Sequence, residues 1–132
     1  MALLRRVLYL QAAVWAIAGA GLAVFPHFLL LTLFNQIYYP DYAWVRIAGL
    51  ETFALAMLMV LVAQRASDVW WWSWAFVFPT GLIAVVAVLN VTLSLPNQSA
   101  PALWWLIAAL HAALLVGLFL GLARTSRERP LP

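Results

Sequence analysis

Four polar residues interrupt long apolar stretches of the sequence, and they are the side chains most able to do chemistry there. They are Arg46, Glu51, Asn90 and His111. A carboxyl group and an imidazole can share a proton or form a charge-assisted hydrogen bond, and a nearby arginine favours the ionised carboxylate. We interpret the four as a candidate ligand-binding site, without assigning a catalytic residue.

The composition explains why these side chains stand out. Of the 132 residues, 67% are hydrophobic and only 8% are charged, whereas an ordinary soluble domain has about 25% charged residues. A membrane crossing takes about 20 apolar residues. The sequence therefore predicts one all-α domain, a polytopic membrane protein with a four-transmembrane-helix bundle and spans at about 7–25, 42–63, 70–95 and 102–123.

The sequence also predicts the structure of two connections between spans, and the first span has an alternative interpretation. The segment 26–40 is too short to cross again but too apolar for a solvated loop, so we expect an interfacial helix or a re-entrant turn between the first two spans. The connection at 96–101 has proline at both ends and predicts a short turn. A cleavable secretory leader is the alternative interpretation of 7–25.

The arginines predict the orientation. Six of the seven fall at the N-terminus, between the second and third spans, or at the C-terminus: Arg5, Arg6, Arg65, Arg124, Arg127 and Arg129. Four spans place these three regions on one side, and basic residues favour the cytoplasmic side. We expect a multi-pass protein of the cell's inner (plasma) membrane with both termini in the cytoplasm.

Depth estimates place the four polar residues in one half of the bilayer. Glu51 and His111 each lie nine residues from the outer end of their spans, about 13 Å deep at a rise of about 1.5 Å per residue. Asn90 and Arg46 are shallower, so we expect a polar pocket that opens toward the outer leaflet. One alternative is a structural polar clamp, in which Arg46 extends toward the membrane surface or pairs with Asp41 and Asn90 caps a neighbouring carbonyl. Another is a proton-coupled transport path.

Small residues mark the expected helix contacts, because helices in lipid associate through close packing. The longest stripe of small residues is on the fourth span: Ala109, Ala113, Gly117 and Gly121. We expect it to pack within the bundle, or alternatively against another subunit.

Several kinds of chemistry are excluded by composition. The chain has no cysteine, which excludes disulfides, thiolate nucleophiles and quinone-reducing CxxC pairs. All basic residues are arginine, so no lysine can form a Schiff base. The depths of His27 and His111 differ by about 13 Å, too far for a shared haem. We expect no cofactor, no metal site and no nucleic-acid partner.

The stretch from Pro26 through Leu33-Phe34 and the element Trp44-Val45-Arg46-Ile47-Ala48-Gly49 to Ala63 resembles the small bacterial membrane proteins grouped as DoxX-like or domain-of-unknown-function families. In those families a W-x-R-x-x-G element opens the second helix. The resemblance implies a bacterial four-span protein and carries over no agreed activity.

We therefore expect a non-enzymatic protein, either an accessory subunit of a membrane complex or a binder of a lipid or other hydrophobic ligand. The expected partners are membrane lipid, other membrane subunits or a homo-oligomer. One alternative is a lipid- or sterol-modifying enzyme that uses Glu51 and His111 for proton transfer. A second is a small proton-coupled transporter that acts as an oligomer.

Overall fold

The computed structural model of the chain describes residues 1–38, 40–93 and 100–128, which form helices and the segments that join them. The long helices are α1 (Ala2–Val24), α3 (Ala43–Gln64), α5 (Trp74–Leu93) and α6 (Pro101–Glu128). The short ones are α2 (Pro26–Phe28), the π-helical turn η1 (Leu29–Leu33), α4 (Ala66–Val69) and the 3-10 turn η2 (Trp70–Ser73). Residue 39, positions 94–99 with most of the predicted turn, and Arg129 lie outside the described residues.

The predicted all-α membrane fold is confirmed. Four helices of the described chain are long and apolar enough to cross a membrane, and the third runs from Ala66 through α4 and η2 to Leu93. Two helices extend past the predicted spans: α1 begins at Ala2 and α6 continues to Glu128. Backbone hydrogen bonding can continue in water, so a helix need not end where its apolar stretch ends.

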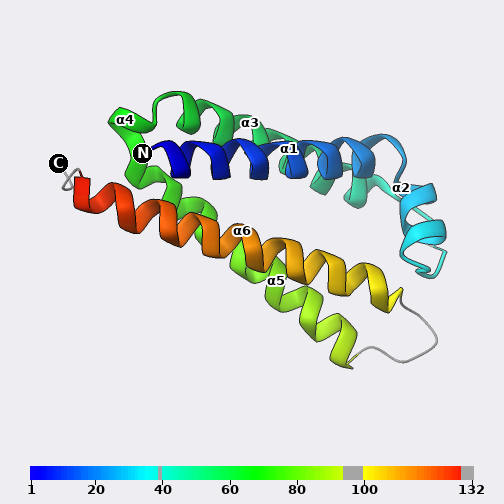
Figure 1. Cartoon of the computed structure of the whole chain (residues 1–132). Coiled ribbons are helices and arrows are strands. Elements are labelled where there is room, and N and C mark those ends of the chain that lie inside the picture. Colours follow the sequence, from blue (N-terminus) through cyan, green and yellow to red (C-terminus); the bar gives the residue numbers. More distant parts are fainter. Residues whose placement is uncertain (39, 94–99, 129–132) are drawn as a thin grey trace.

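The helices form two antiparallel pairs. α1 packs against α3, α5 packs against α6, and α1 also contacts α6, which joins the pairs (Figure 1). The pairs lie closest at the end that holds the N-terminus and α4, here called the terminal end, and diverge toward the other end, the distal end (Figure 1). The buried core follows this shape, since its α1 members Leu4, Leu8, Ala12 and Trp15 lie in the terminal two thirds of that helix.

Glycines allow the closest approach between helices. A Cβ atom built on Gly49 of α3 would lie 2.6 Å from the backbone nitrogen of Ala23 and 2.7 Å from the backbone oxygen of Gly19, both on α1. A Cβ atom on Gly19 would in turn lie 2.7 Å from the oxygen of Gly49. The backbones of α1 and α3 are therefore in contact here, with no space for a side chain between them.

The predicted stripe on α6 divides into two parts. Gly117 faces Val7 of α1, and a Cβ atom on Gly121 would lie 2.9 Å from the Cα atom of Leu4. Ala109 and Ala113 are exposed. Positions four apart turn by about 400° on a helix, so a stripe with this spacing rotates about 40° per step away from a straight neighbour.

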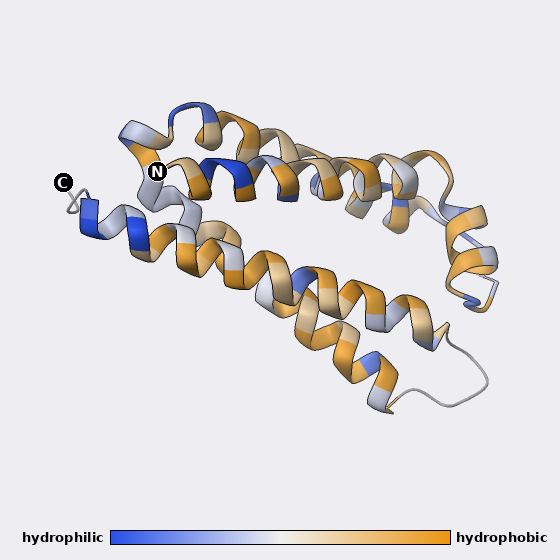
Figure 2. Cartoon of the chain, viewed as in Figure 1, coloured by the Kyte–Doolittle hydropathy of each residue, from blue (hydrophilic) through white to orange (hydrophobic). Residues whose placement is uncertain are grey.

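The terminal end gathers the basic segments, which the sequence predicts to lie on one side of the membrane. The amino group of Met1 forms an ion pair with Glu128 at 3.1 Å. Arg5 donates to the backbone oxygens of Ala63 at 3.0 Å and Gln64 at 3.4 Å, which caps the end of α3. Figure 2 shows hydrophilic residues concentrated at this end and hydrophobic residues along most of the helix lengths.

The segment between the first two spans turns across the distal end and does not form another crossing. α2 and η1 are short helical turns that lie at an angle to α1 (Figure 1). The ring of Phe34, just past η1, lies 5.2 Å from the ring of Trp104 near the start of α6. This contact joins the segment to the second helix pair.

Candidate functional site

His111 points into the bundle from the middle of α6. Its side chain is only 7% exposed, and its ring centroid lies 6.4 Å from that of Trp15 on α1. Its Nδ1 lies 2.9 Å from the backbone oxygen of Ile107. Because a carbonyl oxygen only accepts, Nδ1 is the donor in this hydrogen bond.

A buried hydrogen bond lies near the centre of the bundle. The side-chain amide of Gln11 donates from Nε2 to Oγ1 of Thr80 on α5 at 2.6 Å, and both residues are fully buried. The Thr80 hydroxyl donates to the backbone oxygen of Phe76. This bond ties the α1–α3 pair to the α5–α6 pair. Gln11, Trp15, Thr80 and His111 are together called the interior polar cluster.

Two atoms of the interior polar cluster are buried without a partner. They are Oε1 of Gln11 and Nε1 of Trp15, an acceptor and a donor one helical turn apart on α1. Gln11, Trp15 and Thr80 are not among the candidate residues that the sequence predicts. One feature of the sequence could have identified two of them: Gln11 and Thr80 are polar residues within apolar spans, where an unpaired polar group costs several kcal/mol.

The two predicted charged residues lie outside this cluster. Arg46 and Glu51 are both exposed on α3, whose buried positions Gly49, Ala56 and Ala63 face the rest of the bundle. Within the described ranges, neither side chain makes a hydrogen bond or an ion pair. Five residues correspond to about 500° of helix rotation, so the two side chains leave α3 about 140° apart.

The two expected contacts of acidic residues, Asp41 with Arg46 and Glu51 with His111, are not formed in the described residues. The Asp41 carboxylate accepts from the backbone nitrogen of Ala43, the first residue of α3, at 2.8 Å. No hydrogen bond joins Glu51 to His111 in the part of the chain that is described. Coupling between Glu51 and His111 stays a prediction.

Asn90 is half-buried near the distal end of α5. It continues the row of Thr80 and Ala87, since positions seven and three apart lie on nearly the same helix face. The structure therefore buries His111 and half-buries Asn90, whereas Arg46 and Glu51 are exposed. The candidate ligand-binding site made of these four residues stays a prediction.

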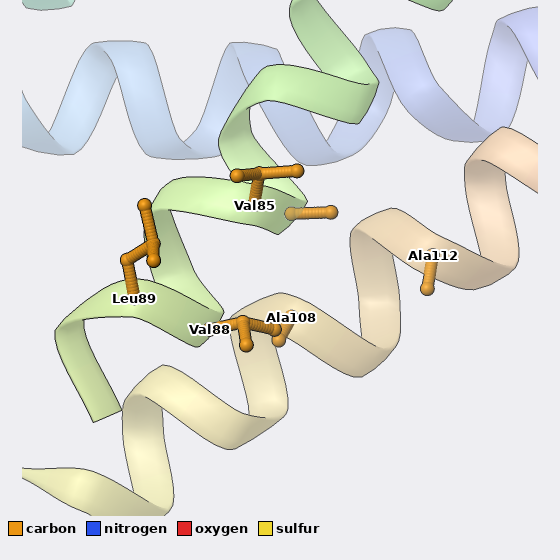
Figure 3. A pocket seen from close by; sticks show the side chains of 6 residues that line it. Val85, Val88, Leu89, Ala108 and Ala112 are labelled. Atoms are coloured by element: carbon orange, nitrogen blue, oxygen red, sulfur yellow. The ribbon is translucent and has the colours of Figure 1, made fainter. Parts of the chain in front are cut away.

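A shallow apolar groove lies between α5 and α6. Its volume is about 260 Å³, and its lining residues are Ala84, Val85, Val88, Leu89, Ala108 and Ala112. Figure 3 shows the labelled side chains of both helices around it, all of them hydrocarbon. Such a surface offers dispersion contacts and no hydrogen bond.

Histidine and acidic side chains do not gather into a metal site in the described ranges. His27 is exposed at the distal end, and its ring packs edge-on against Tyr38 and Tyr42, with centroid separations of 6.1 and 5.7 Å. It therefore belongs to an aromatic cluster that is separate from His111.

Comparison with protein-family models, with curated proteins and with solved structures finds no match for this chain. The function must therefore be inferred from the placement of its own residues. The resemblance to DoxX-like proteins stays an expectation.

Proposed function

We propose that this integral membrane protein is a non-enzymatic subunit of a membrane assembly and that it binds its partner through α3. The observation that carries the proposal is the exposed, unpartnered side chain of Glu51. Ionisable residues within spans usually face protein or a wet cavity. A partner that covers Glu51 would supply the missing protein surface.

The depth of Glu51 is central to this argument. α3 has 22 residues, so it is about 33 Å long and matches a hydrocarbon core of about 30 Å. Glu51 lies eight residues from Ala43, about 12 Å from the distal end. A glutamate side chain is too short to bring its carboxyl group to the membrane surface from that depth, whereas Arg46 lies within about 5 Å of the helix end.

The interior polar cluster supports a structural role. Its hydrogen bond connects the two helix pairs, and it contains no carboxylate and no nucleophile activated by a neighbouring base. Proton exchange between Glu51 and His111 needs hydrogen-bond distance, directly or through one water. We therefore favour the subunit over the proton-transferring enzyme.

Lipid binding is a second candidate, and the groove between α5 and α6 favours it. The groove is lined by alanine, valine and leucine, which suits an acyl chain. Asn90 lies close by in sequence, one residue beyond Leu89. A bound lipid would appear as an added mass on the protein and is compatible with the subunit role.

Native mass spectrometry of protein extracted in mild detergent tests the proposal. We expect wild type to carry a stoichiometric protein partner and Glu51→Gln to bind it about tenfold more weakly, which corresponds to about 1.4 kcal/mol. Glu128→Gln is the matched control, because Glu128 lies at the end of α6 and pairs with the N-terminus. A wild-type protein that carries only lipid would contradict the subunit role.

A further inference from the structure

We propose that the partner is a second copy of this chain, aligned parallel in the membrane, with Arg46 of each copy paired to Glu51 of the other. This inference rests on the proposed subunit role and names the partner. It begins from three features of the exposed side of α3: an apolar stripe, one positive flank and one negative flank.

The apolar stripe follows the spacing of a helix pair. Exposed residues recur at alternating intervals of three and four along α3: Ile47, Leu50, Ala54, Met57 and Leu61. They include the most exposed aliphatic side chains of the α3 interior, with Leu50 at 60% and Leu61 at 58%. This 3.5-residue repeat is the a and d pattern by which two helices pack along a seam. These five residues are called the exposed stripe.

Arg46 and Glu51 flank the exposed stripe on opposite sides. If Ile47 and Leu50 occupy positions a and d, Arg46 falls at g and Glu51 at the following e. They diverge by about 140° on one helix, so they cannot pair with each other on α3. Their separation of about 7.5 Å along the axis is within reach of an extended arginine side chain from a neighbouring helix.

Two-fold symmetry brings these flanks together. When two parallel helices face each other about an axis along the membrane normal, the g flank of one lies against the e flank of the other. Arg46 of one copy then meets Glu51 of the partner, and symmetry forms the same pair a second time. Both copies insert in the same direction, so the required depths match without adjustment.

This charge pattern identifies the second copy as the partner. A face with one positive and one negative flank is complementary to itself under a two-fold axis, which is the commonest symmetry of oligomers. A different partner chain would need its own apolar seam with a matching acid and base at the same depth. Ala54 adds to the fit, because a small residue in the seam permits close helix approach in lipid.

Complementary charge reversal tests the pairing. Two differently tagged chains are expressed, one with R46E and the other with E51R. The first has negative charge on both flanks and the second positive charge on both, so each repels its own copies. Together they restore two opposite-charge contacts. We expect each variant alone to self-associate at least about tenfold more weakly than wild type. The mixture should recover nearly wild-type association.

The chain carrying both R46E and E51R should also self-associate like wild type, and E128R is the control outside the exposed stripe. If a reversed chain does not insert, R46Q and E51Q should each weaken the dimer in its place. A mixture no better associated than either variant alone overturns the charge pairing. A purified wild-type monomer that binds a different chain in native membranes overturns the second copy but retains the subunit role. A monomer with no protein partner in both settings rejects both.

Discussion

Replacing Gly49 by alanine is expected to lower the free energy of unfolding by about 1–3 kcal/mol, the usual cost of overpacking. The added Cβ atom would lie within 3 Å of the Ala23 nitrogen, the Gly19 oxygen and Cβ of Leu22. Two of these are backbone atoms, which cannot rotate away, so α1 and α3 must separate. Gly49→Leu should prevent the two helices from packing.

Gly81→Ala is the matched control for this prediction. Gly81 is also in a membrane helix, but its Cβ atom would lie 3.7 Å from the side chain of Leu115, an ordinary contact. Alanine has the higher helix propensity, so we expect this variant to be at least as stable as wild type. Thermal unfolding of both purified variants in the same detergent decides the matter. Equal midpoints would show that the contact between Gly19 and Gly49 does not limit the packing of α1 on α3.

Replacing Thr80 by valine is expected to cost about 1–2 kcal/mol, as for other polar contacts between membrane helices. The substitution keeps the shape but removes the acceptor for the Gln11 amide. Because Oε1 of Gln11 already has no partner, its whole amide group would be buried and unpaired. The loss should also loosen the two helix pairs from each other.

A second substitution separates this mechanism from a general defect. In a protein that already carries Thr80→Val, the substitution Gln11→Leu removes the buried, unpaired amide and should restore much of the lost stability. Thr92→Val is the control, since Thr92 is exposed on the same helix and its hydroxyl bonds to carbonyl oxygens of that helix, Val88 and Leu89. If the double variant is no more stable than Thr80→Val, the unpaired amide is not the cause.

The sequence was sufficient for the number of spans and for the gathering of the basic segments at one end. The number of spans depends mainly on the length and hydropathy of each apolar stretch. The gathering of the basic segments depends mainly on where the arginines fall between those stretches. The sequence was insufficient to predict which side of each helix faces the bundle. Glu51 and His111 have similar estimated depths, yet one faces outward and the other inward, because the packing of α1 decides which side of α3 is covered.

The spacing of small residues is a better indicator of which helix face is buried. Gly49, Ala56 and Ala63 are seven apart and all buried, so they stay on one face of α3. Ala109 and Ala113 of the stripe at intervals of four lie on an exposed face. The exact contact of Gly49 with Gly19 still needed the structure, because nothing in one helix specifies the height at which its neighbour crosses it.

Cysteine cross-linking in native membranes tests most directly whether α3 is the contact between two copies. The chain contains no cysteine, so one introduced thiol can only form a disulfide with another copy or with a foreign protein. Leu50→Cys and Met57→Cys lie on the exposed stripe, and Leu106→Cys and Val116→Cys are controls on α6, where the native residues are 63% and 57% exposed. We predict that oxidation gives dimers of twice the chain mass for both α3 variants and little for the α6 variants. Absence of α3 dimers, or equal cross-linking from α6, would contradict the account.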